Sequence, residues 1–202
     1  MITTTQEMKK KFKEMTFRDE RVMRLALKDI TFTEEILRIL MFEDSLYLSS
    51  IEEDKIIYLD GMPVFIFDFV AKGKKKGIYG ICLLDHYDDE MEQRILYVQG
   101  LLRNEYDQDN SRDDLYTICI CIGDENKKYP YYIPGISLIH FEKQSEIIDY
   151  GIRIFVLQKI ENPLSLLESV INDFYQEKPA DIQNDFMKEK LAWTVWELEN
   201  SD

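Results

Sequence analysis

The sequence predicts an α/β fold, in which a mixed central sheet is flanked by helices and further strands and helices follow toward the C-terminus. Two observations carry this prediction. The apolar pattern changes along the chain from helical spacing to strand-sized runs and back again, and one strongly apolar strand follows a helix. A strand that is reached through a helix implies a crossover connection, and therefore parallel pairing inside the sheet.

Two helices are predicted between residues 7 and 42, where apolar residues recur at helical spacing among charged ones. Thr31 or Thr33 is the expected N-cap of the second helix. Each precedes an acidic first turn that contains Glu34 and Glu35, which favours the positive end of a helix dipole.

Three strands are predicted after these helices. The turn Asp60-Gly61 separates the first two strands, and a glycine-bounded lysine loop at residues 72–77 separates the second from the third. Lysines in such a loop are typical of a solvated turn that protects a sheet edge. The predicted strands occupy residues 55–59, 62–71 and 78–84.

A helix at residues 88–106 and a buried strand at residues 115–122 complete the predicted core. Residues 129–134 are expected to form a proline-bounded aromatic loop. Asn162 is the expected N-cap of the next helix, with Pro163 at its first position. Beyond the core, we expect an edge hairpin and two acidic helices; their residues are 136–141 with 152–157, then 162–174 and 181–198.

Size and composition predict one domain. The chain has 202 residues, of which 45% are hydrophobic, enough for a real core. We expect a core at residues 1–160 and an acidic helical extension at residues 161–202 that packs on it. No apolar run approaches the roughly 20 residues that span a bilayer, and residues 1–15 lack the apolar segment of a secretory signal. These features predict a cytoplasmic protein that does not enter a membrane.

All three cysteines, Cys82, Cys119 and Cys121, lie inside apolar strand-like runs. This placement predicts reduced, buried thiols. A zinc site is not expected, because the chain has no CxxC pair and only His86 and His140 as histidines. Phosphate-loop, dinucleotide-binding and serine-hydrolase motifs are also missing from the sequence.

Several segments, taken in order, resemble the PD-(D/E)XK nuclease family transposases, which are relatives of the recombination-promoting nucleases. The resemblance covers about residues 16 to 160 and implies a restriction-endonuclease-like fold. It comprises two N-terminal helices, a catalytic hairpin, a helix with an early arginine and a tyrosine, and a buried strand with an acidic turn. These segments are residues 16–23, 33–40, 64–70 with 78–84, 92–97 and 115–124.

In that family, an Asp and a Glu on adjacent strands hold Mg²⁺, and a Lys or Gln two positions after the Glu orients the attacking water. The resemblance places Asp68 at the first ligand. It places Cys82 at the Glu position and Leu84 at the Lys or Gln position. Cysteine is a poor Mg²⁺ ligand and leucine cannot polarise water, so we expect a degenerate member without the usual catalysis.

The alternative is a Mg²⁺-dependent DNA endonuclease with a displaced second acid. Asp68 would then act with Asp85, which needs a bulge or turn to reach the same face of the strand. Asp19 or Glu20 of the first helix would supply a further metal ligand, and Lys76 would act from the loop.

Structural roles for the same positions stand beside these. Asp68 can be a strand-end acid that pairs with Arg94 or another base, and Cys82 can be a small buried apolar residue. In this interpretation, Asp68, Cys82, Leu84 and Arg94 are the remnant of an ancestral motif.

The predicted function is therefore binding of a protein partner, without a cofactor. A net charge of −14 disfavours phosphate-backbone binding and favours a basic partner, such as a nucleic-acid-binding enzyme. The resemblance to a family found among mobile elements implies that this partner could be a host defence enzyme, which the protein would inhibit. Tyr131, Tyr132, Asp88 and Asp89 are the expected contact residues, and a homodimer is a further expectation.

Overall fold

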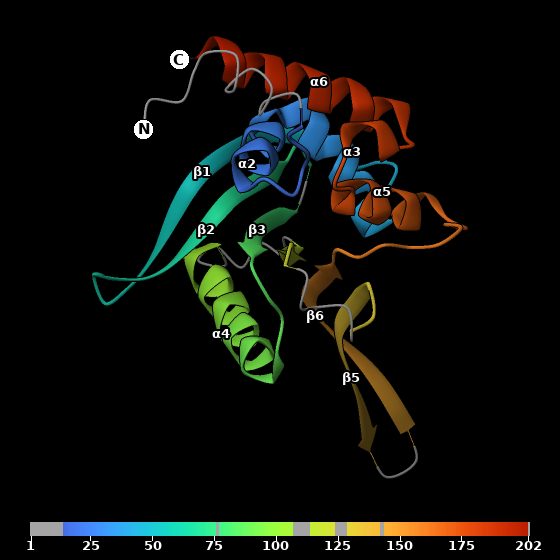
Figure 1. Ribbon diagram of the computed structural model, residues 1–202. Coiled ribbons are helices and arrows are strands. Elements are labelled where there is room, and N and C mark those ends of the chain that lie inside the picture. The colour runs from blue at the N-terminus through green and yellow to red at the C-terminus, as the bar shows by residue number, and fades with distance from the viewer. Residues whose placement is uncertain (1–13, 76, 107–113, 124–128, 142–143, 202) are drawn as a thin grey trace. The chain divides into compact units, whose positions relative to one another are not determined.

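The computed structural model describes residues 14–75, 77–106, 114–123, 129–141 and 144–201; for residues 89, 92, 136–141 and 144–148 only the backbone is described. The chain forms two compact units. Unit 1 combines Met1–Leu46 with Leu157–Asp202, and unit 2 is the continuous segment Tyr47–Val156. Unit 1 is helical and unit 2 carries the sheet (Figure 1).

Within the described residues, unit 2 contains one six-stranded mixed sheet in the order β1-β2-β3-β4-β6-β5. The first three strands are antiparallel neighbours, β3, β4 and β6 are parallel, and β5 is antiparallel to β6. The prediction of a mixed α/β fold is confirmed. The strands are β1 (Leu48–Leu59), β2 (Met62–Gly73), β3 (Ile78–Leu84), β4 (Leu115–Cys121), β5 (Tyr132–Phe141) and β6 (Gln144–Val156).

Helix α4 (Asp89–Tyr106) makes the predicted crossover from β3 to the parallel strand β4. Its buried face packs into the same apolar cluster as the sheet. A polar contact fixes the helix against the sheet: the buried Gln99 side chain donates to the Leu115 carbonyl at 2.8 Å and accepts from the Thr117 hydroxyl at 2.5 Å. A buried side-chain amide needs hydrogen-bond partners, so these two bonds favour one position of α4 on the sheet.

Gly151 leaves room for the hydrogen bond between the Gln99 side chain and the Leu115 carbonyl. Its φ is +73°, and a Cβ on it would collide with the Leu115 carbonyl oxygen and lie 2.9 Å from Gln99 Nε2. Only glycine combines that backbone conformation with no side chain.

Unit 1 contains helices that pack through aromatic rings. Phe17 stacks on Phe32 at a centroid distance of 5.9 Å, and Phe174 meets both rings edge to face at 5.2 and 6.4 Å. Helix α6 contacts α2, and α5 contacts α3. The helices are α2 (Glu20–Lys28), α3 (Ile30–Met41), α5 (Leu166–Tyr175) and α6 (Asp185–Asn200), with a short 3₁₀ turn at Pro179–Asp181.

The N-cap of α3 is Asp29, so the prediction of Thr31 or Thr33 is wrong. The Asp29 carboxylate accepts hydrogen bonds from the Thr31 N–H at 2.8 Å and the Phe32 N–H at 3.2 Å. Thr33 is buried instead, and its hydroxyl donates to the Leu27 carbonyl. An aspartate two residues upstream competes successfully because its oxygens reach the free N–H groups of the first turn.

The start of α5 also differs from the prediction. Asn162 adopts a left-handed backbone with φ +57°, so no helix begins there or at Pro163. The N-cap is Ser165, which forms a capping box with Glu168. Near the other end of α5, Asp173 is fully buried, with 0% exposure. Its carboxylate accepts hydrogen bonds from the Gln183 and Asn184 N–H groups, both at 2.8 Å, and these bonds fix the segment that leads into α6.

Four strands, β1, β2, β5 and β6, are longer than the sequence predicts. Strand β1 begins at Leu48 rather than residue 55, and β5 begins at Tyr132, inside the expected aromatic loop. The predicted edge hairpin is confirmed, but its register differs. Residues 152–155 pair with residues 132–135 and not with residues 136–141. Pro134 is tolerated in β5 because this strand lies at the edge of the sheet.

The predicted division at residue 160 stays a prediction. Within unit 1, the C-terminal helices α5 and α6 pack on the N-terminal helices α3 and α2. Among the described residues, no helix has both the length and the apolar character to cross a membrane.

We predict opposite effects for two glycine-to-alanine changes in unit 2. Gly151→Ala should lower the free energy of unfolding by about 2–4 kcal/mol, since it combines a left-handed backbone with a steric clash. Gly100→Ala, in open space on α4, should raise it by about 0.5–1 kcal/mol. Urea denaturation measures both, and equal effects would contradict the packing described for Gly151.

Candidate functional site

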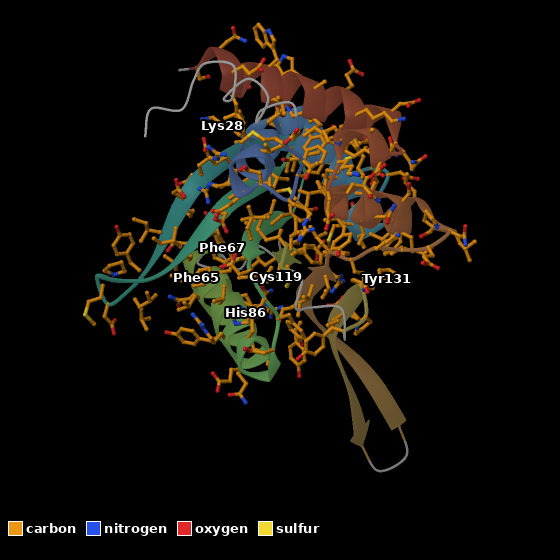
Figure 2. The ribbon with its side chains drawn as sticks, in the orientation of Figure 1. Lys28, Phe65, Phe67, His86, Cys119 and Tyr131 are labelled. Carbon is orange, nitrogen blue, oxygen red and sulfur yellow. The ribbon has the colours of Figure 1, made fainter. Side chains whose placement is uncertain are left out.

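Strand β3, which the resemblance places at the family's catalytic strand, presents one thiol and apolar groups to the helix α4. Cys82 is the parallel partner of Cys119, and Leu84 is the partner of Cys121. All three cysteines are free and buried, as predicted, and they belong to the apolar cluster beneath α4. Phe65 and Phe67 of β2, labelled with Cys119 in Figure 2, meet edge to face at 5.0 Å beside this cluster.

Two of these thiols, those of Cys82 and Cys121, are held in the protonated form. The hydrogen bond between the Cys82 and Cys119 thiols, together with burial, raises the pKa of Cys82 well above its usual range, and the nearby Asp68 charge acts in the same direction. Burial and the neighbouring Cys119 raise the pKa of Cys121 as well. A protonated, buried thiol is a poor nucleophile and a poor metal ligand.

Asp68 lies where the β2–β3 ladder ends. The last paired residues are Phe69 and Ile81. Two residues further along β3, the Leu83 N–H donates to an Asp68 carboxylate oxygen at 2.7 Å. A side-chain oxygen thus replaces the backbone carbonyl that would continue the ladder. This satisfies a strand-end donor. A pairing of Asp68 with Arg94 stays a prediction; Arg94 is exposed on α4.

The other residues of the endonuclease alternative are dispersed over different elements. Asp85 is exposed after β3, and Glu20 is an exposed first-turn residue of α2 in unit 1. Lys76 lies outside the described residues. In the part of the chain that the structure describes, no three His, Cys, Asp or Glu side chains group as metal ligands would.

The expected partner-binding residues have local structural contacts. Tyr132 stacks on Phe155 at 5.2 Å, and burial raises its pKa although the positive charge of Arg153 opposes that rise. Tyr131, labelled in Figure 2, is half-buried. Asp88 accepts from the Met91 N–H at 2.7 Å and lies 3.4 Å from the His86 ring nitrogen, while the Asp89 side chain lies outside the description.

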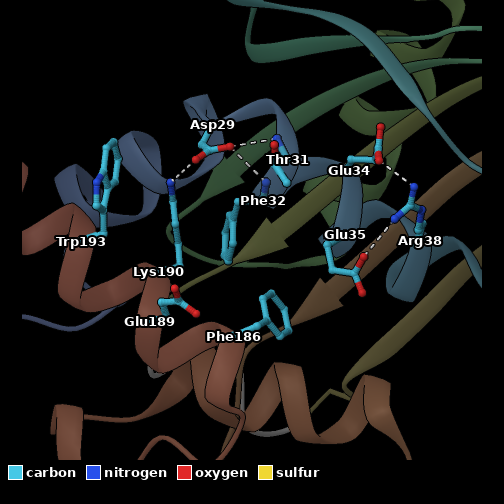
Figure 3. A pocket seen from close by; sticks show the side chains of 10 residues that line it. All are labelled: Asp29, Thr31, Phe32, Glu34, Glu35, Arg38, Phe186, Glu189, Lys190 and Trp193. Carbon is cyan, nitrogen blue, oxygen red and sulfur yellow. Dashed lines mark hydrogen bonds and ion pairs between the residues drawn. The ribbon is translucent and has the colours of Figure 1, made fainter.

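Unit 1 contains a pocket that the sequence did not reveal. It has a volume of about 540 Å³ and lies between α3 and α6 (Figure 3). Its walls combine aromatic rings with charged side chains. The lining residues are Asp29, Thr31, Phe32, Glu34, Glu35, Arg38, Phe186, Glu189, Lys190 and Trp193.

Lys190 is the central cation of this pocket. Its side chain is 9% exposed, its ammonium lies 2.7 Å from an Asp29 oxygen, and the same ammonium lies 4.4 Å from the Trp193 ring centroid and 5.7 Å from that of Phe32. A nearly buried ammonium requires such compensation by a carboxylate and by ring faces.

The Asp29 carboxyl responds to this cation. Burial by itself raises the pKa of Asp29, but the hydrogen bond and charge of Lys190, with the N–H groups of Phe32 and Thr31, hold that pKa below its ordinary value. Asp29 therefore has two roles, since it caps α3 and anchors α6 through Lys190.

Arg38 is the second cation of the pocket. Its guanidinium contacts Glu34 at 2.6 Å and Glu35 at 3.1 Å, and its Nε donates to the Leu46 carbonyl at 2.8 Å. These bonds occupy the donor fork of Arg38 with groups of the protein itself. Glu189, in contrast, is exposed and has no ion-pair partner among the described residues.

No family model, curated protein or solved structure matches this chain. The resemblance to the nuclease family transposases therefore stays a prediction.

A matched pair of variants tests the Asp29–Lys190 contact. Asp29→Asn keeps an N-cap acceptor but removes the charge that compensates Lys190. It should cost about 1–2 kcal/mol at pH 7, because the carboxylate is partly exposed while the ammonium is nearly buried. Since the folded-state pKa is lowered, this contribution is present above about pH 4 and is lost as the pH falls through the folded-state pKa.

Urea denaturation between pH 3 and pH 7 measures the difference between the wild type and Asp29→Asn. Asp185→Asn serves as a control, because Asp185 is 99% exposed in its ion pair and should show little effect. A difference for Asp29→Asn that grows toward low pH would contradict the ion pair.

We also expect the native thiols to be unreactive. At pH 8, a thiol-modifying disulfide reagent should label none of Cys82, Cys119 and Cys121 in the folded protein, and all three in denaturing urea. A Ser45→Cys variant, at an exposed position, supplies a reactive control thiol. Labelling of a native cysteine at the rate of this control would show that the β3–β4 cluster opens.

Proposed function

We propose that this chain is a non-catalytic protein on a restriction-endonuclease-like frame, related to the PD-(D/E)XK nuclease family transposases, and that it acts by binding a partner protein. The observation that carries the proposal is the face of β3 beneath α4. Cys82 and Leu84, at the positions where the family would have its second acid and its Lys or Gln, pack into the apolar core with Cys119 and Cys121.

The sheet order supports the frame. A hairpin of β2 and β3, a helical crossover and a parallel strand β4 follow one another as the resemblance implies. Hydrolysis with Mg²⁺ on such a frame needs carboxylates from adjacent strands. Here the facing residue is a protonated thiol, and the one acid at this place, Asp68, accepts the Leu83 N–H.

Charge and surface support a binding role. The net charge of −14 repels a phosphate backbone and attracts a basic surface, such as that of a nucleic-acid-binding enzyme. The pocket between α3 and α6 offers aromatic walls and carboxylates at a scale typical of ligand sites.

Nicking of supercoiled plasmid in Mg²⁺ or Mn²⁺ tests the proposal. We expect the wild type and Asp68→Asn to give the same background, because no metal-bound water is generated. Asparagine keeps an oxygen that can accept the Leu83 N–H, so this variant should fold with an unchanged thermal midpoint. Cleavage by the wild type that is lost in folded Asp68→Asn would overturn the proposal in favour of the endonuclease.

A further inference from the structure

We infer that the pocket between α3 and α6 takes a basic segment of the partner protein: an arginine or lysine side chain that enters between Glu35 and Glu189 and lays its apolar stem against Phe186 and Trp193. This inference rests on the proposed binding function and assigns that function a site and a ligand chemistry.

The balance of charge in the pocket favours a cationic guest. Its lining holds four carboxylates and two cations, a net charge of −2 from 4 acids minus 2 bases. Both cations are engaged, Lys190 with Asp29 and Arg38 with the Glu34 and Glu35 carboxylates. The negative charge is therefore what an incoming side chain meets.

Two of the carboxylates are accessible to such a guest. The Glu35 side chain is 45% exposed, in contrast to 17% for Glu34. Glu189 is exposed and has no ion pair within the described residues. In Figure 3, the Phe186 ring is drawn between Glu35 and Glu189, and all three line the pocket.

The aromatic walls suit the stem of a long basic side chain. Phe186 packs against Phe32 at a centroid distance of 5.9 Å, which holds it in place, and Trp193 is 47% exposed on α6. Arginine and lysine bury methylene groups on apolar surfaces while their charged ends stay near carboxylates, and ring faces attract cations. A volume of about 540 Å³ admits more than one such side chain.

An acidic peptide or a nucleic acid fits this pocket poorly. Its phosphates or carboxylates would face Glu35 and Glu189, and the ammonium of Lys190 is nearly buried against Asp29. Like charges placed opposite one another at an interface are unfavourable.

Tryptophan fluorescence gives a direct test, because the only tryptophans are Trp193 and Trp196, both on α6. In Trp196→Phe, Trp193 alone reports on the pocket. The probe is a capped pentapeptide, Gly-Arg-Leu-Arg-Gly, compared with versions in which both arginines are glutamine or glutamate. We expect a saturable change with the arginine peptide only.

Two charge reversals in the Trp196→Phe background provide matched variants. Glu189→Lys should weaken binding of the arginine peptide by about tenfold, since a like charge then faces the guest. Glu161→Lys changes the net charge equally at an exposed position outside the pocket, and at physiological ionic strength should weaken binding by about twofold or less.

Equal weakening by the two reversals, tighter binding of the glutamate peptide, or no saturable change with the arginine peptide would each overturn the inference. None of these outcomes affects the proposed function, since a partner could then bind elsewhere. That function is instead overturned by DNA cleavage that depends on Asp68, whatever the peptide titration shows.

Discussion

Strands β3 and β4 pair in parallel from Ile78 opposite Leu115 to Leu84 opposite Cys121, and the architecture of unit 2 depends on this pairing. Parallel neighbours need a crossover, which α4 supplies. The covered face must then be apolar, because α4 excludes water from it. An unpaired carboxylate or a lysine in place of Cys82 or Leu84 would be buried at a high free-energy cost. The residues that stabilise the interior of this sheet are therefore a thiol and an apolar side chain, and neither type is a favoured Mg²⁺ ligand.

In unit 1, an ion pair helps to fix the packing of the helices α3 and α6. Beside the Phe32 ring of the aromatic cluster, Lys190 of α6 forms an ion pair with Asp29 at the start of α3. Because Lys190 covers the Phe32 ring and Asp29 orders the first turn of α3, one ion pair sets how both helices line the pocket. The shape of the pocket and the packing of α3 and α6 are thus coupled in this unit.

The sequence allowed the parts of the fold that depend on local pattern to be predicted. Strand β3 has the predicted bounds, the crossover through α4 is present, and the three thiols are buried. Helix starts were less predictable, because Asp29 and Ser165 compete as caps with nearby Thr and Asn residues and tertiary packing decides between them. The pocket was not predictable, since Asp29 and Lys190 are 161 positions apart and no periodic pattern links them.

The division of the chain has a consequence for the order of its folding during synthesis. Unit 2 is continuous, so all its strands and α4 have been synthesised before α5 and α6 exist. Unit 1 cannot close until its last segment has left the ribosome, and until then the apolar faces of α2 and α3 lack the partners that cover them later. Domains tend to fold as units during translation, so unit 2 can fold while α2 and α3 are still unpacked. A chaperone that binds the nascent chain would therefore meet a folded sheet and two helices with uncovered apolar faces.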